Sequence, residues 1–215
     1  MMQLMSVKGS PYAARVRLQI YRKNLPVEII FPPQSGLKSA EFLKLNPIGK
    51  IPVLLLDDGA ALPESHVILE YLEDRFPEQP LRPEAAEARA RMRLLMQIGD
   101  LYVFAAIGKL FRQANPAKRD AEIVAKADAE LRRALGLLEG QLGPGPFALG
   151  DDYTLADCSL LPVLFFAALM AEHIGLENCF ATPRLAAYWA ALQADAVSAK
   201  VLAELDYGAR KMLVK

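Results

Sequence analysis

The sequence predicts two domains of different class, an α+β domain with a four-stranded mixed sheet and helices, followed by an all-helical bundle. The first 80 residues hold 9 of the 15 prolines and short apolar runs separated by turns, a pattern typical of strands. From Glu84 onward apolar residues recur at intervals of three or four, a pattern typical of helices. With 215 residues, 53% of them apolar, the chain is long enough for both domains.

The elements of the first domain are expected to alternate between strand and helix. Apolar runs at 3–7, 27–31 and 52–56 predict three strands, and the turn Asp57-Asp58-Gly59 precedes a short fourth strand at 60–62. The stretches 12–22, 39–45 and 65–76 have helical spacing. The resulting order, β-α-β-α-β-β-α, indicates a small sheet flanked by helices.

The second domain is expected to be helical throughout. Residues 77–83 contain three prolines and predict a linker between a first domain, 1–79, and a second, 84–215. Helical patterns cover 84–112 and 120–142. A third helix opens at Thr154, with Asp157 as its capping-box partner. Because that helix is apolar on every side, we expect it at the centre of the bundle.

Composition excludes several classes of function. Lys+Arg and Asp+Glu both number 25, so the chain lacks the basic excess of a nucleic-acid binder. The two cysteines, Cys158 and Cys179, lie in apolar sequence with no metal-ligand or disulfide spacing, so we expect packed side chains and no metal. The N-terminus has no secretory signal, and the longest apolar stretch, 160–171, is about half a membrane span. We therefore expect a cytoplasmic protein that does not bind membranes.

The segment GSPYAARVR, residues 9–17, has the frame of a dithiol redox motif without its thiols. A strand running into Cys-Pro-Tyr-Cys at the head of a helix would be a redox site, but Ser10 and Ala13 occupy the two cysteine positions. From these residues alone, a role as a plain helix N-cap explains a serine before Pro11 as well as a role in an active site does.

Three further segments occur in order after this one: NPIGKIPVL at 46–54, ESHVILEYLE at 64–73 and TLADCSLLP at 154–162. With these segments and its helical second half, the whole chain resembles the cytosolic glutathione S-transferases, particularly the Ser-type classes and their bacterial relatives. The resemblance implies a thioredoxin-like first domain, glutathione as co-substrate and a homodimer.

In such a protein the substrate brings the thiol, and the protein ionises it. A free thiol has a pKa of about 8.5, so little thiolate exists near neutral pH. The positive end of a helix favours an anion, and the Ser10 hydroxyl can donate a hydrogen bond to the sulfur. Tyr12 is the rival for this role. Ser10 stands six residues before Val16, the spacing of the Ser-type pattern, so we assign Tyr12 to the acceptor pocket, with Phe104 from the second domain.

The resemblance also implies the residues that bind glutathione. A cis Ile51–Pro52 bond would leave the Ile51 backbone to pair with the cysteinyl part. Glu64, and Ser65 as a helix N-cap, would bind the γ-glutamyl end, whereas Lys38 and Lys50 are candidates for the glycine carboxylate. The implied reaction is attack of the thiolate on a small hydrophobic electrophile. The alternatives are glutathione-dependent cis–trans isomerisation of the maleylacetoacetate type and a non-catalytic binding module.

Overall fold

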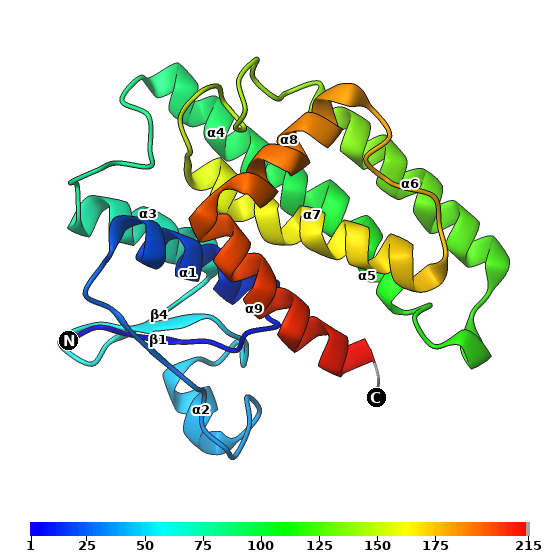
Figure 1. Ribbon diagram of the computed structural model, residues 1–215. Helices are drawn as coiled ribbons and strands as arrows, with labels where there is room; N and C mark the ends of the chain where they lie inside the picture. The colour runs from blue at the N-terminus through cyan, green and yellow to red at the C-terminus, as the bar shows by residue number, and fades with distance from the viewer. Residues whose placement is uncertain (214–215) are drawn as a thin grey trace. The chain divides into compact units, whose positions relative to one another are not determined.

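The first part of the chain forms a four-stranded mixed sheet (Figure 1). The structure is a computed structural model that describes residues 1–213. The strands are β1 (Gln3–Met5), β2 (Glu28–Ile30), β3 (Val53–Leu55) and β4 (Ala61–Pro63). Their order is β2-β1-β3-β4, with β1 parallel to β2 and antiparallel to β3, and with β3 antiparallel to β4. The predicted mixed sheet is confirmed, and β1, β2 and β3 are each shorter than their apolar runs.

Three helices alternate with these strands: α1 (Pro11–Lys23), α2 (Ala40–Leu45) and α3 (Ser65–Arg75). The sequence specifies the ends of α1. Ser10 caps its start ahead of a proline at the first helical position, and Asn24 ends it in the left-handed conformation. Every side chain from Ala13 to Ile20 in α1 is buried, so α1 is a core element although it includes two arginines.

The second part is helical, as predicted. Its elements are α4 (Ala86–Ile98), the π-helix η1 (Gly99–Phe104), α5 (Ala105–Phe111), the 3₁₀ helix η2 (Pro116–Lys118), α6 (Ala121–Glu139), α7 (Leu155–Ile174) and α8 (Pro183–Ala194). The single helix expected over 84–112 was wrong in one respect, because a π-helical segment separates α4 from α5. At that junction Gly99 packs closely on α7, where a Cβ atom would lie 2.8 Å from the Leu160 side chain. Apolar residues spaced by three or four do not distinguish a π-turn from α-helix.

Helix α7 is the core of this helical part, and its predicted cap is present. All but one of its residues from Leu155 to Ala171 are buried. The Thr154–Asp157 capping box forms, and the Thr154 N–H donates to the Asp157 carboxylate at 2.7 Å. Asp157 also accepts from the Ala148 N–H at 2.8 Å and from the Tyr188 hydroxyl at 2.9 Å. The carboxylate therefore joins the start of α7 to a loop and to α8.

Contacts divide the chain into two compact units. One comprises Met1–Leu81 together with the described part of the chain from Val197, and the other is Arg82–Ala196. The last helix, α9 (Ala196–Leu213), thus has its contacts with the sheet and α1, although it follows the helical part in sequence. In Figure 1 it is the red helix that crosses α1.

By length and composition alone, two stretches within residues 1–213 could cross a membrane. They are Ala86–Phe111, whose most apolar window is 44% buried in the structure, and Leu155–Ile174, whose window is 89% buried. A buried core helix of a soluble protein has the same composition, so these stretches are weak indications of a membrane span.

Candidate functional site

Strand register brings the predicted site segments to one edge of the sheet. Ile30 of β2 pairs with Met5 of β1, Met5 pairs with Val53 of β3, and Val53 pairs with Pro63 of β4. These four residues form one row across the sheet. The segments that contain Ser10, Ile51, Glu64 and Ser65 begin or end within a few residues of this row. Segments distant in sequence therefore share one edge.

Ser10 lies five residues beyond Met5, at the N-terminus of α1. Its side chain is half-buried, and its Oγ accepts a hydrogen bond from the Ala13 N–H at 3.2 Å. The N-cap interpretation of Ser10 is thus confirmed, and it is compatible with a second role. A hydroxyl that accepts through its oxygen still has its own proton to donate. The positive end of the helix dipole also favours a negative charge beside it.

Glu64 and Ser65 follow Pro63 directly, and here one expectation was wrong. The structure places Glu64 at the cap position of α3, while Ser65 is its first residue and not the N-cap. Glu64 has φ +71°, a conformation that is unfavourable for any residue other than glycine. Such strained backbone is concentrated at functional sites. The Glu64 side chain is exposed and Ser65 is buried.

Arg15 connects these two segments, and sequence reasoning missed it. Its guanidinium is completely buried, and Nη1 lies 3.4 Å from the Ser65 Oγ and 3.1 Å from the His66 Nε2. The same guanidinium stacks over the Tyr12 ring at 4.9 Å. The Ser65 oxygen accepts a hydrogen bond from Arg15, so the Ser65 hydroxyl can donate its own proton to another acceptor. The positive charge of Arg15 lies next to this hydroxyl. A signal existed, since an arginine on a buried helix face requires partners.

The turn before β3 contains the third segment. The Ile51–Pro52 peptide bond is cis, as the resemblance implied. The buried side chain of Asn46 holds the turn, because its amide donates to the Lys50 carbonyl at 2.8 Å and its Oδ1 accepts from the Ile48 N–H at 3.1 Å. Asn46 is a second residue that sequence reasoning missed.

The Lys38 ammonium also lies at this turn. It donates to the Ile48 carbonyl at 3.4 Å and lies directly against Gly49, while the Lys50 side chain is exposed. Both candidates for the glycine carboxylate are therefore associated with the turn, Lys38 through its ammonium and Lys50 as a residue of the turn.

The two predicted acceptor-pocket residues, Tyr12 and Phe104, belong to different compact units. Tyr12 is 37% exposed and lies beside Ser10 in the sequence. Phe104 is half-buried and packs edge-on against Phe166 at 6.3 Å between ring centroids.

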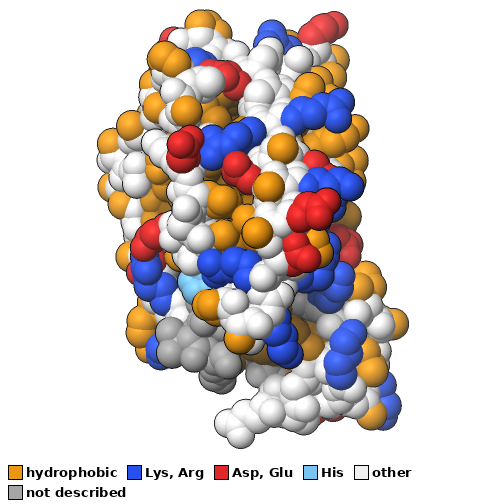
Figure 2. Space-filling model, turned by 90° about the vertical axis from the view of Figure 1, so that its right-hand side faces the viewer, with side chains coloured by type: hydrophobic (Ala, Val, Ile, Leu, Met, Phe, Trp, Pro, Cys, Tyr) orange, Lys and Arg blue, Asp and Glu red, His pale blue; other side chains and the backbone are white. Residues whose placement is uncertain are grey.

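Surface charge has no dominant sign on the face that Figure 2 shows. Basic and acidic side chains alternate there, with hydrophobic side chains between them, in keeping with equal numbers of the two charges. Among residues 1–213, the structure brings together no group of three or more metal-ligating side chains.

Comparison with known proteins identifies the family to which this chain belongs. The model of the glutathione S-transferase N-terminal domain matches residues 4–80, and the model of the C-terminal domain matches residues 121–191. The chain belongs to the glutathione S-transferase family.

Individual relatives of this family member have different names. A stringent starvation protein A homolog from Coxiella burnetii is 31% identical over 76% of this chain and 74% of that protein. A probable glutathione S-transferase from Zea mays is 30% identical over 95% of this chain and 92% of that protein. Among solved structures, a glutathione S-transferase from Methylobacillus flagellatus with glutathione bound is 28% identical, with a TM-score of 0.78 over 94% of this chain and 98% of that chain. The two-part fold expected from the sequence is thereby confirmed.

Proposed function

We propose that this family member is a Ser-type glutathione transferase, in which Ser10 activates the glutathione thiol for attack on a small hydrophobic electrophile. The observation that supports this proposal is the row from Ile30 to Pro63, which gathers Ser10, Ile51 and Ser65 at one edge of the sheet. Together these segments offer groups that suit an extended tripeptide, which has a thiol between two charged ends.

Each end of glutathione has a complementary group at this edge. The Ser65 hydroxyl, supported by the buried Arg15 guanidinium, suits the γ-glutamyl carboxylate, and the exposed Glu64 suits the ammonium. Lys38 and Lys50 suit the glycine carboxylate. The Ile51 backbone, next to its cis proline, would pair with the cysteinyl part.

Ser10 would then act on the sulfur. Its oxygen is occupied by the Ala13 N–H, so its proton is available to the thiolate, and the first turn of α1 adds the field of the helix N-terminus. A decrease of ~2 units in the thiol pKa corresponds to about 2.7 kcal/mol, within reach of these two effects together. The thiolate forms a bond to the electrophilic carbon, and the leaving group departs with the electron pair of the bond that breaks.

Ser10→Ala tests this role. We expect glutathione binding, measured by calorimetry, to remain within a few-fold of wild type, because both charged ends keep their partners. Turnover with chlorodinitrobenzene should fall by about ten- to a thousandfold, as expected for removal of one hydrogen bond to a reacting anion. Tyr12→Phe is the matched control and should retain its activity. Full activity of Ser10→Ala together with loss in Tyr12→Phe would transfer the role to Tyr12.

Two other functions each have a relative that favours them. A probable maleylacetoacetate isomerase 2 from Drosophila melanogaster is 29% identical over 71% of this chain, which favours glutathione-dependent isomerisation. A rice elongation factor 1-gamma 2 is 32% identical over 79% of this chain and 41% of that protein, which favours a binding module. Isomerase turnover without conjugation would support the first, and glutathione binding without either reaction would support the second.

We also propose that the protein is a cytoplasmic homodimer. Exposed apolar side chains on α4, η1 and α6 support the dimer: Leu94, Leu101, Tyr102 and Leu137. Sedimentation equilibrium tests the proposal, since a monomer at micromolar concentration would contradict it.

A further inference from the structure

The segment between β1 and Ser10 is held by one buried guanidinium. Arg17 is 2% exposed, and its Nη1 donates to the Ser6 Oγ at 2.6 Å and to the Val7 carbonyl at 3.0 Å. Its Nη2 donates to the Lys8 carbonyl at 2.9 Å. Three consecutive residues that lead to Ser10 are thus fixed by a side chain from the second turn of α1.

The Nε donor of this guanidinium reaches α9. Arg17 Nε donates to the Glu204 Oε2 at 2.8 Å, and the Tyr21 hydroxyl donates to the Glu204 Oε1 at 3.0 Å. Burial lowers the pKa of Arg17, and the Glu204 carboxylate opposes this effect. Burial, with Glu204 beside it, raises the pKa of Tyr21 to about 12, so the phenol remains a donor. Both carboxylate oxygens of Glu204 therefore have fixed partners.

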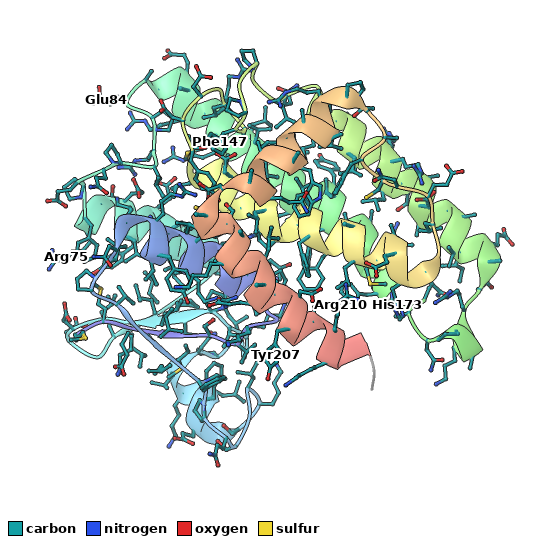
Figure 3. The ribbon with its side chains drawn as sticks, in the orientation of Figure 1. Arg75, Glu84, Phe147, His173, Tyr207 and Arg210 are labelled. Carbon is teal, nitrogen blue, oxygen red and sulfur yellow. The ribbon has the colours of Figure 1, made fainter. Side chains whose placement is uncertain are left out.

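A backbone contact places α9 against the same segment. A Cβ atom on Gly208 would lie 2.2 Å from the Gly9 nitrogen, and one on Gly9 would lie 2.8 Å from the Gly208 carbonyl carbon. No side chain fits at either position. One residue before each glycine, the Lys8 ammonium lies 5.3 Å from the centre of the Tyr207 ring, and Figure 3 labels Tyr207 on α9.

We propose that Glu204 of α9 is a positioning residue for the thiol-activating serine, and that it acts through Arg17 on residues 6–9. This inference rests on the role of Ser10 given above and extends it, because it makes the C-terminal helix part of the sulfur subsite.

The physical reason is that the Ser10 hydroxyl must be held rigidly in order to donate to the glutathione sulfur. Ser10 donates its own N–H to the Val7 carbonyl at 3.1 Å, the same carbonyl that Arg17 holds. A displacement of Val7 is therefore passed to Ser10. Misplacement of a catalytic group by about 1 Å can lower the rate about a hundredfold. The Glu204 carboxylate accepts hydrogen bonds from Arg17 and Tyr21, and neither residue is assigned to an end of glutathione, so binding should respond much less than turnover.

Hydrogen exchange followed by mass spectrometry tests the positioning without glutathione. In Glu204→Gln, which preserves the shape of the side chain and removes its charge, we expect faster exchange of the amides of residues 6–10. Asp206→Asn is the matched control, because it breaks the exposed Asp206–Arg210 pair, 2.7 Å long, on the same helix. This control should leave the exchange of residues 6–10 unchanged. Unchanged exchange in Glu204→Gln would overturn the proposal.

Glutathione kinetics test the consequence for chemistry. In Glu204→Gln the pKa of the enzyme-bound glutathione thiol should rise toward its free value, and kcat should fall about ten- to a hundredfold, with the Kd of glutathione within a few-fold of wild type. A merely structural Glu204 would lower the melting temperature and leave the thiol pKa unchanged, which would overturn the proposal. Failure of the wild-type protein to bind glutathione would instead overturn the proposed function, and this extension with it.

Two further variants serve if Glu204→Gln does not fold. Tyr21→Phe removes only the Oε1 hydrogen bond and should produce the same changes to a smaller extent. Gly208→Ala changes no charge and forces a methyl group against Gly9, so it should also raise the thiol pKa. Wild-type thiol pKa values in both variants would overturn the proposal.

Discussion

Asp157 offers the strongest test of how the helical part folds. Its side chain is completely buried and accepts four hydrogen bonds, two of them from Thr154. Asp157→Ala removes the acceptor for four donors: the Ala148 N–H, the Thr154 N–H, the Thr154 hydroxyl and the Tyr188 hydroxyl. All of these donors lie in buried surroundings around the start of α7.

The magnitude follows from the donors left behind. A buried donor without a partner costs about 1–3 kcal/mol. Four such donors, taken at the low end because removal of a buried charge relieves its desolvation, give a loss of about 4 kcal/mol in the free energy of unfolding. In a chain of this size about 1 kcal/mol corresponds to roughly 2–4 °C, so the melting temperature should fall by about 8–16 °C.

Differential scanning calorimetry measures this change, and two comparisons make it specific. Tyr188→Phe removes one donor and leaves the carboxylate with three bonds, so it should cost only about 0.5–1.5 kcal/mol. Glutathione binding and its Michaelis constant should remain near wild type in both variants, since Asp157 lies within the helical unit and has its bonds there.

Two results would refute this reasoning. A melting temperature within about 2 °C of wild type, less than 1 kcal/mol by the same conversion, would show that the four bonds contribute little. A stable Asp157→Ala protein with impaired glutathione kinetics would place Asp157 in the active site.

Two remaining predictions concern thiols. Ser10→Cys should give a thiol that titrates below the free value of about 8.5, because it stands at a helix N-terminus, and that exchanges with oxidised glutathione to form a mixed disulfide and release one glutathione thiolate; a thiol that titrates near the free value would show that the proposed field at this position is absent. Burial raises the pKa of Cys179 to about 11, and Cys158 is completely buried, so neither should react with iodoacetamide in the native protein near neutral pH. Rapid alkylation before unfolding, followed by mass spectrometry, would contradict this packing.

Local patterns were sufficient for most elements of the fold. Alternation and turn residues predicted all four strands, and Ser10 before Pro11 predicted the start of α1. Thr154 and Asp157 predicted the start of α7, because a capping box is completed within four residues. The π-helical segment η1 was not predictable, since its residues keep the apolar spacing of an ordinary helix and the distinction arises from packing of Gly99 on α7.

The residues of the candidate site also divide into those that the sequence predicted and those that only the structure revealed. The site residues near the ends of strands and helices were predicted from the sequence: Ser10, Lys50, Ile51, Glu64 and Ser65. Arg15 and Asn46 were missed, because their importance arises from partners that only the folded chain supplies. Arg15 meets Ser65 across 50 positions, and a sequence pattern contains no information on which buried cation faces which hydroxyl.

The sequence by itself determined the order and type of the elements in the sheet domain and the starts of α1 and α7, because caps, turns and apolar spacing act within a few residues. Tertiary structure alone decided that α9 belongs with the sheet. Glu204 meets Arg17 across 187 positions, and Gly208 meets Gly9 at a distance that excludes any side chain. Charge pairing and close backbone packing of this kind depend on the final course of the chain, so the contact between the last helix and the serine segment exists only in the folded protein.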